Sequence, residues 1–373
     1  MQNKKVPPAS EIRSTFHKIY YKDIAPIMAK YEKKRQFEWF KIFIIEAILI
    51  TLLIIGLKFF WSNLMFRTVS PELAFFCILA NFIFLGGIMG VPTVKNNNFA
   101  KMLKASCMNN VVSAFGNMKW GSIIGKGISD SQLVESELFS TFNRRSNDDI
   151  FEGTFKNVNY TILETDLSYV SSSGQRSSVR PVFKGVIINF DANKTIKNKT
   201  IIVTKDDTNI KNRSWSLLSL IAVLICLPLG IYLKDMEVCF NGVLGLISFI
   251  IAIYCEKTNK NKEVLNAIKL EDSEFNKKYK AYSSDEVEGR YLITTAFMER
   301  FKNLQTAFGA RGVKCSFYGE SLMFAISTNK NLFEIGNLFT PLNSPKQLDV
   351  FFNELISILA FIDYFKLDEK TGL

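Results

Sequence analysis

Four long apolar blocks restrict what this chain can fold into. They run over Phe40–Trp61, Leu73–Val94, Trp215–Leu233 and Val238–Cys255. A helix needs about 20 apolar residues to cross a bilayer core of ~30 Å, and each block is close to that length. Only the four residues Lys234–Glu237 separate the last two blocks. We therefore expect four transmembrane helices arranged as two helical hairpins.

The basic residues beside these blocks predict the orientation. They are Lys30, Lys33, Lys34 and Arg35 before the first block, Lys95, Lys101 and Lys104 after the second, Lys205, Lys211 and Arg213 before the third, and Lys257, Lys260 and Lys262 after the fourth. The two opposite turns hold only Arg67 and Lys234. Cytoplasmic loops carry an excess of Lys and Arg. The pattern predicts a multi-pass protein of the inner (cytoplasmic) membrane, with both termini in the cytoplasm. No cleavable signal is expected, because the segment before the first block is long and no small-residue cleavage site follows.

The spacing of the blocks divides the chain into five segments. The fold class that we expect is a membrane α-helical protein with a cytoplasmic α+β domain split in sequence. The segments are 1–38, a basic cytoplasmic tail; 39–95, the first transmembrane hairpin; 96–213, the first part of the α+β domain; 214–256, the second hairpin; and 257–373, the second part of the domain. Because an even number of crossings lies between the two parts, they can fold together.

Charge and cysteine content exclude several classes of protein. The net charge of +11 is concentrated in the segments 1–37 and 96–213 beside the membrane blocks, so no nucleic-acid partner is expected. The chain has six cysteines without a CxxC pair, and its one histidine is His17. A disulfide framework and a zinc site are therefore excluded. No cofactor or metal is expected, and the expected partners are the bilayer, anionic lipids, and an unknown protein or a second copy.

Patterns in the first soluble segment predict one helix followed by strands. Phe99–Phe115 is amphipathic. The expected strands are Phe151–Tyr160, Thr161–Val170, Val182–Phe190 and Thr200–Val203, with a flexible loop at Ser171–Ser178 and a turn at Asp191–Lys194. These assignments follow from alternating apolar residues and from turn-forming residues between them.

Patterns in the second soluble segment predict both helices and strands after Phe275–Tyr282. A helix begins near Asp285, and another begins at Thr294 or Thr295 and ends before Gly309, with Phe297, Phe301, Leu304 and Phe308 on one face. Gly319-Glu-Ser between two apolar runs indicates a β-hairpin. Ser344 and Pro345 start a last helix. Its stripe of Leu348, Phe352, Leu355, Leu359 and Ile362 faces a core, or alternatively the membrane or a partner.

Several runs of residues resemble a known family. They are Ile268–Arg300, Phe151-Glu-Gly-Thr-Phe155, Phe183-Lys-Gly-Val-Ile-Ile-Asn-Phe-Asp191 and Leu322-Met-Phe-Ala-Ile-Ser327. Together they resemble the bacterial membrane-protein family catalogued as domain of unknown function 3137. The resemblance implies a helical hairpin followed by a cytoplasmic α+β domain, and it supplies no catalytic or binding residues. Most relatives carry a soluble linker where this chain has its second hairpin.

No motif amounts to a catalytic signature. In Gly116–Gly127 the glycines Gly121 and Gly125 are separated by three residues, and Lys126 precedes Gly127, so the run fails the phosphate-loop spacing and indicates a turn. The adjacent acidic pairs are Asp148/Asp149, Glu271/Asp272 and Asp285/Glu286. Such pairs can hold a metal, but we interpret them as solvated or helix N-terminal residues.

A few polar residues in or beside the blocks are candidate functional positions. Lys30, Lys33, Lys34 and Arg35 are candidates for lipid head-group contact. Glu46, Asn81 and Asn241 are intramembrane polar positions. Glu46 is expected to be solvated or paired with Lys41 or Lys30. Gly86 and Gly90 form a small-xxx-small spacing, which suggests close helix packing.

The pattern as a whole favours a membrane-anchored cytoplasmic interaction or scaffold module rather than an enzyme. Two alternatives stay open. A small-solute or ion transporter needs polar residues that face one another at mid-membrane depth, and only Glu46, Asn81 and Asn241 qualify. A membrane-bound enzyme needs a carboxylate cluster in a pocket.

Overall fold

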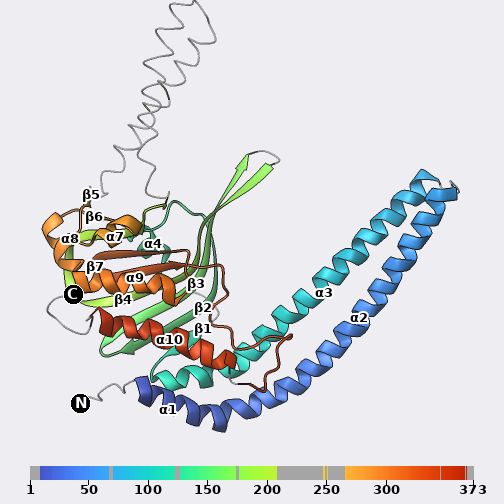
Figure 1. Cartoon of the computed structure of the whole chain (residues 1–373), viewed down its shortest axis with the longest axis horizontal. Helices are drawn as coiled ribbons and strands as arrows, with labels where there is room; N and C mark the ends of the chain where they lie inside the picture. Colours follow the sequence, from blue (N-terminus) through green and yellow to red (C-terminus); the bar gives the residue numbers. More distant parts are fainter. Residues whose placement is uncertain are drawn as a thin grey trace, which may run out of the picture. The chain divides into compact units, whose positions relative to one another are not determined.

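The protein divides into two compact units. The computed structural model describes residues 9–66, 70–121, 127–173, 176–207, 265–344 and 346–365, with the single positions 247, 250 and 367 (Figure 1). Unit 1 comprises Met1–Gly121, Phe151–Thr154 and Asn331–Ala360, and unit 2 comprises Ser122–Ile150, Phe155–Lys330 and Phe361–Leu373. The third and fourth expected membrane helices lie outside the described residues, apart from positions 247 and 250.

Long helices form most of unit 1. Helix α1 (Ala9–Ile19) leads through a π-helical turn, η1 (Tyr20–Ile24), into α2 (Ala25–Phe66), and α3 (Pro71–Val112) follows and ends in a 3-10 turn, η2 (Ser113–Phe115). The helices α2 and α3 each have 42 residues and run side by side (Figure 1). At 1.5 Å per residue each is ~63 Å long, about twice the thickness of a bilayer core. Only part of each helix can therefore lie in a membrane.

The two long helices approach each other at glycines that the sequence did not indicate. A Cβ at Gly56 would lie 2.7 Å from Asn81 Oδ1, and a Cβ at Gly87 would lie 3.2 Å from a Leu49 methyl. A Cβ at Gly86 or Gly90 would meet nothing within 4 Å. The close helix packing that the spacing of Gly86 and Gly90 suggests is therefore not found in the described chain. One residue along a helix turns the side-chain direction by about 100°, so Gly87 faces α2 and Gly86 does not.

The expected amphipathic stretch after the second block is the last third of α3. Phe99, Leu103 and Val111 are buried there. Helix α10 (Lys346–Tyr364) contributes to the same unit through Phe352, whose ring stacks on Phe16 at 4.4 Å. The remaining members of the α10 stripe, Leu348, Leu355, Leu359 and Ile362, are buried as well. The prediction that this stripe faces a core is confirmed. The Ser344 hydroxyl accepts a hydrogen bond from the Lys346 amide at 3.4 Å, as expected of a cap.

An antiparallel sheet follows the long helices in the chain. Its strands are β1 (Lys119–Gly121), β2 (Arg144–Phe155), β3 (Val158–Ser173), β4 (Arg176–Thr204), β5 (Asn266–Ile268), β6 (Tyr279–Ser283) and β7 (Gly312–Ser327). They follow the order β1-β2-β3-β4-β6-β5, and β7 also pairs with β4. Strand β4 precedes the second expected hairpin, whereas β6 and β7 follow it. The prediction that the two soluble segments fold together is confirmed.

Two local strand predictions are wrong because they ignore pairing. The expected strand Phe151–Tyr160 is interrupted by a tight turn at Lys156 and Asn157, which both have positive φ angles (49° and 62°), and this turn separates β2 from β3. In the expected loop Ser171–Ser178, the described residues Ser171–Ser173 and Arg176–Ser178 are strand, because the β3–β4 ladder continues to the pair Ser173↔Arg176. Backbone hydrogen bonds of a ladder do not depend on apolar side chains, so a serine-rich run can extend a strand.

The expected turn at Asp191–Lys194 and the expected hairpin at Gly319 are both absent from the described chain. Strands β4 and β7 run through these positions without reversing. Their register shifts there instead, from Asp191↔Ser321 to Ile196↔Gly319, and Gly319 has a φ of 57°. The turn-forming residues of the two strands thus lie opposite each other and form an irregularity of the ladder, as bulges do.

Helices cover both faces of the unit 2 sheet. Successive side chains of a strand point to opposite faces. On one face Phe324 contacts Phe301 of α9 (Thr295–Ala307) and Phe361 of α10, with ring centroids 6.3 and 5.3 Å apart. On the other face Met323 and Ala325 belong to a buried cluster with Leu133 of α4 (Asp130–Glu135). The expected apolar face of α9, formed by Phe297, Phe301, Leu304 and Phe308, is buried as predicted.

Two further short helices complete unit 2. They are α7 (Ser273–Lys278) and α8 (Glu286–Leu292). The Asp285 carboxylate caps α8 by accepting from the Glu288 amide at 2.9 Å. Asp272 caps α7 by accepting from the Glu274 and Phe275 amides. The interpretation of Asp285/Glu286 as helix N-terminal residues is confirmed.

Candidate functional site

The apolar parts of the two long helices are the main feature of unit 1. We call Phe40–Trp61 of α2 and Phe75–Val94 of α3 the apolar arm. Its large apolar side chains are exposed on all sides of the helix pair, with exposed fractions such as 58 % for Ile55, 68 % for Phe82 and 73 % for Met89. Both helices are long and apolar enough to cross a membrane. Two candidate membrane-spanning helices suggest membrane association.

An ionic cluster marks the end of the apolar arm. Glu38 accepts from Lys41 at 3.0 Å on its own helix and from Lys95 at 3.3 Å on α3. The Lys41 hydrogen bond and then Lys95 lower the pKa of the Glu38 carboxyl against its partial burial. Lys41 was one of two partners expected for Glu46, but it binds Glu38 instead. Trp39 is half exposed at the same level, as residues of a membrane–water boundary are.

The intramembrane polar positions have separate surroundings. The Asn81 amide nitrogen donates to the Cys77 carbonyl at 2.8 Å, and its Oδ1 faces Gly56 with no hydrogen-bond partner in the described chain. Glu46 is half-buried on α2. It is ten positions from Gly56, which corresponds to ~15 Å along a helix, so Glu46 and Asn81 do not form a pair. Asn241 lies outside the described residues.

The four basic residues proposed for lipid contact do not behave alike. Arg35 donates to both carboxylate oxygens of Glu32, at 2.8 and 2.7 Å, and to the Leu338 carbonyl at 3.2 Å. Glu32 also accepts from the Leu342 amide at 2.9 Å, and the Arg35 hydrogen bond is the main cause that lowers its pKa to about 2. Arg35 thus holds α2 to the segment around Leu338. The side chains of Lys30, Lys33 and Lys34 are exposed.

An acidic cluster lies on neighbouring strands of unit 2. Asp148 and Asp149 of β2 and Glu164 of β3 each offer a carboxylate oxygen, and these oxygens lie within 4.8 Å of one another. Asp149 is fully buried and Glu164 nearly so. The interpretation of the Asp148/Asp149 pair as solvated is therefore wrong for Asp149. Glu164 could not be found from the sequence, because only the alignment of β2 with β3 brings it to the pair.

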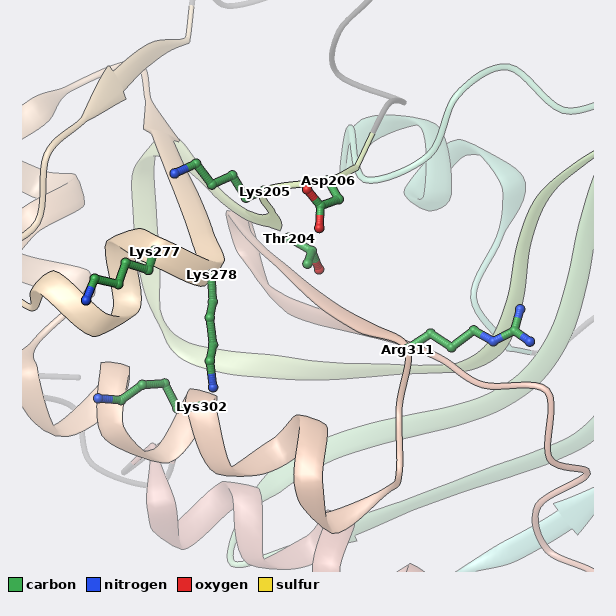
Figure 2. Close-up of a pocket in the computed structure, with 7 residues that line it drawn as sticks. All are labelled: Thr204, Lys205, Asp206, Lys277, Lys278, Lys302 and Arg311. Carbon is green, nitrogen blue, oxygen red and sulfur yellow. The ribbon is translucent and has the colours of Figure 1, made fainter.

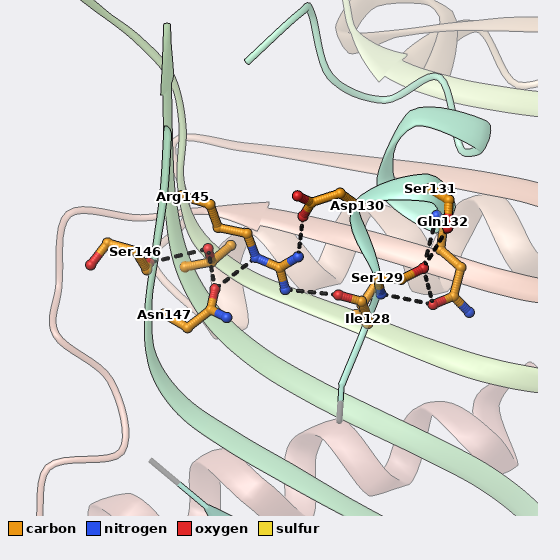
Figure 3. A network of polar contacts seen from close by, with 9 residues as sticks. Ile128, Ser129, Asp130, Ser131, Gln132, Arg145, Ser146 and Asn147 are labelled. Atoms are coloured by element: carbon orange, nitrogen blue, oxygen red, sulfur yellow. Dashed lines mark hydrogen bonds and ion pairs between the residues drawn. The ribbon is translucent and has the colours of Figure 1, made fainter. Parts of the chain in front are cut away.

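Beside the acidic cluster, a polar network joins α4 to β2 (Figure 3). Arg145 donates to Asp130 at 2.5 Å, to Asn147 at 2.8 Å and to the Ile128 carbonyl at 2.8 Å. Ser129 forms a capping box with Gln132 at the start of α4. The guanidinium donors of Arg145 are thus directed at protein acceptors, and the network has a structural role.

The two buried cysteines, Cys107 and Cys315, are not activated as nucleophiles. Burial raises the pKa of the Cys107 thiol to about 11 and that of Cys315 well above its usual value. A thiol needs a lowered pKa to act as a nucleophile near neutral pH. His17 lies exposed on α1. The described parts of Gly116–Gly127 connect η2 to β1 and then to α4, as the interpretation of this run as a turn predicts.

A cationic depression in unit 2, which we call the basic basin, was not expected from the sequence. Its volume is about 490 Å³, and its lining residues are Thr204, Lys205, Asp206, Lys277, Lys278, Lys302 and Arg311 (Figure 2). Five cationic residues and one carboxylate, that of Asp206, therefore line the basin. The end of β4 and the end of α7 meet here, because Thr204 pairs with Tyr279 and the Lys205 amide donates to the Lys278 carbonyl at 2.8 Å.

The comparison with known families identifies the second half of the chain. The family described as Protein of unknown function (DUF3137) matches residues 181–367, from β4 to the end of α10. The chain belongs to this family. No curated protein and no solved structure matches it. The match includes all of the basic basin and lies entirely outside the apolar arm, so the basin belongs to the family domain.

Proposed function

We propose that this member of the family is a membrane-anchored interaction module. Its apolar arm spans the bilayer, and its family domain is displayed at the cytoplasmic surface of a bacterial inner membrane. The observation that carries the proposal is the exposure of apolar side chains all around α2 and α3. Exposed apolar surface of this extent is unfavourable in water by roughly 25 cal/mol per Å², and a bilayer core removes that cost.

The sequence supports a second membrane hairpin over 214–256. Its two apolar runs are each about the length that a membrane helix needs, and basic residues flank them. With this hairpin the protein has four transmembrane helices, and both termini lie in the cytoplasm. Exposed Lys30, Lys33 and Lys34 then lie beside the bilayer, where they can contact anionic head groups.

The polar residues of the apolar arm favour an anchor over a transporter. A transport path needs several polar groups at one depth. Asn81 contacts its own helix backbone and Gly56, and Glu46 is about 15 Å further along α2. A flux assay in liposomes tests this choice, and a specific flux of any solute would support transport instead.

Two experiments test the anchored module. Reporters fused after Asp207 and at the C-terminus should both indicate the cytoplasm, and a reporter on the opposite side would contradict the four-helix topology. Purification in native lipid discs followed by mass spectrometry should then yield a reproducible protein companion. If the discs contain only a specific lipid or small molecule, the interaction role is wrong.

A further inference from the structure

The basic basin contains three lysines that the fold does not neutralise. Lys205, Lys277 and Lys278 are exposed, and no ion pair involves them in the described chain. The other two cations have partners. Lys302 binds Asp272 at 2.7 Å and Glu274 at 3.6 Å, and Arg311 points away from the lysines in Figure 2. Three free ammonium groups in one depression form a surface for a multiply charged anion.

Two chain segments hold these lysines together. Lys277 and Lys278 form the last turn of α7, where cations complement the helix dipole. Lys205 follows the end of β4, and its backbone bond to Lys278 fixes the distance between the segments. The three lysines therefore line one depression, in which Asp206 is the one carboxylate among the lining residues, and an anion nearby reduces their mutual repulsion.

The position of the basin in the chain indicates which anion it meets. Lys205 precedes the apolar run that begins at Trp215, and Leu265 follows the run that ends at Cys255. About ten residues of extended chain reach at most ~35 Å. If the second hairpin spans the bilayer, Lys205 and Leu265 each lie within that length of chain from the membrane.

From these observations we propose that the basic basin binds the head groups of anionic phospholipids and so fixes the family domain against the membrane. The inference rests on the proposed membrane anchoring. Each lysine near an anionic surface contributes an interaction that corresponds to about a fivefold change in an equilibrium constant. The interaction is electrostatic, so it weakens when salt shortens the screening length below ~10 Å.

Lysine acetylation footprinting of the full chain in lipid discs tests the proposal. Discs of phosphatidylcholine alone are compared with discs that also contain phosphatidylglycerol. Acetylation of Lys205, Lys277 and Lys278 should slow about fivefold in the anionic discs and recover at high salt. The exposed lysines Lys184 and Lys197 are internal controls and should label equally in both.

A matched pair of variants gives a second readout. The variant Lys205→Gln, Lys277→Gln, Lys278→Gln should retain less phosphatidylglycerol in native mass spectrometry than the wild type. The control Lys184→Gln, Lys197→Gln, Lys330→Gln removes the same charge from exposed positions outside the basin, and it should retain as much as the wild type. Equal loss in both variants would contradict a specific role of the basin.

The remaining outcomes separate this inference from the anchoring. Equal labelling of an incorporated protein in both kinds of disc overturns the basin inference and leaves the anchoring standing. Protection by inorganic phosphate in neutral discs, without protection by phosphatidylglycerol, assigns the basin to a soluble anion and also overturns it. Release of the protein by alkaline carbonate overturns the anchoring, and the inference with it.

Discussion

The apolar arm and the unit 2 sheet contain the same kinds of side chain in opposite surroundings. Phe82 in the arm is 68 % exposed, whereas Phe324 in β7 is fully buried among aromatic rings of α9 and α10. Burial of a phenylalanine stabilises a fold in water by roughly 1.5–3 kcal/mol relative to exposure. Because Phe82 is exposed, it contributes little of this stabilisation to the folded chain in water. It gains the stabilisation when a bilayer surrounds the arm. The two regions thus differ in the solvent they require.

The difference extends to polar groups. In the arm, the described hydrogen bond of the Asn81 side chain stays within its own helix. Outside the arm, polar groups join distant segments, as Glu32 and Arg35 do with residues near Leu338. Two changes therefore mark the ends of the arm. The residues change from apolar to polar, and side-chain hydrogen bonds begin to join segments that are distant in sequence.

The largest expected effect comes from truncating the buried ring. Phe324→Ala should lower the free energy of unfolding of unit 2 by about 4 kcal/mol, because it leaves a cavity between the sheet and its helices. The matched variant Phe82→Ala should change it by less than about 0.5 kcal/mol. Hydrogen exchange of the β4 and β7 peptides in detergent micelles measures both. Similar losses from the two variants would show that the arm packs like a core.

A smaller effect is expected at Glu32. Glu32→Gln removes the buried acidic partner of the partly buried Arg35, which costs about 3 kcal/mol. Thermal unfolding of the wild type and the variant in the same detergent gives the difference, and the exposed pair variant Glu286→Gln serves as the control. If Glu32→Gln unfolds at the same temperature as the wild type, Arg35 has no structural role and is again a candidate for lipid contact.

The same carboxyl predicts a pH dependence. The pKa of Glu32 is lowered in the fold to about 2. A lowered pKa stabilises the folded protein at pH values above the pKa of glutamate in the unfolded chain, about 4.3. This stabilisation is lost as the pH falls from about 4.3 toward about 2. The stability difference between the wild type and Glu32→Gln should therefore shrink over this range. A difference that stays constant below pH 4 would contradict the lowered pKa.

The smallest effect separates two kinds of glycine in the arm. Gly56→Ala places a methyl group 2.7 Å from Asn81 Oδ1 and should separate α2 from α3 at a cost of about 1 kcal/mol, while Gly90→Ala meets nothing. Disulfide trapping between cysteines placed on the two helices reports their distance. Equal trapping in both variants would mean that the helices do not pack at Gly56.

Local patterns predicted the elements that depend on neighbouring residues. The long apolar helices α2 and α3, the apolar face of α9 and the caps at Asp285 and Ser344 all follow from short spacings. The errors occur where the pairing of strands determines the local structure. Gly319 resembles a hairpin turn until β4 is known to lie beside it. The basic basin and the position of Glu164 beside Asp149 arise in the same way, because residues far apart in sequence meet only across paired strands.

Depth-dependent quenching by brominated lipids tests the membrane location of the apolar arm most directly. Trp39 and Trp61 lie near its two ends and are 47 % and 66 % exposed, and Ile50 between them is 43 % exposed. In reconstituted single-tryptophan variants, Trp39 and Trp61 should be quenched most by shallow bromines, and tryptophan in Ile50→Trp by deep ones. Weak quenching at all three positions, at every bromine depth, would contradict the membrane-spanning arm.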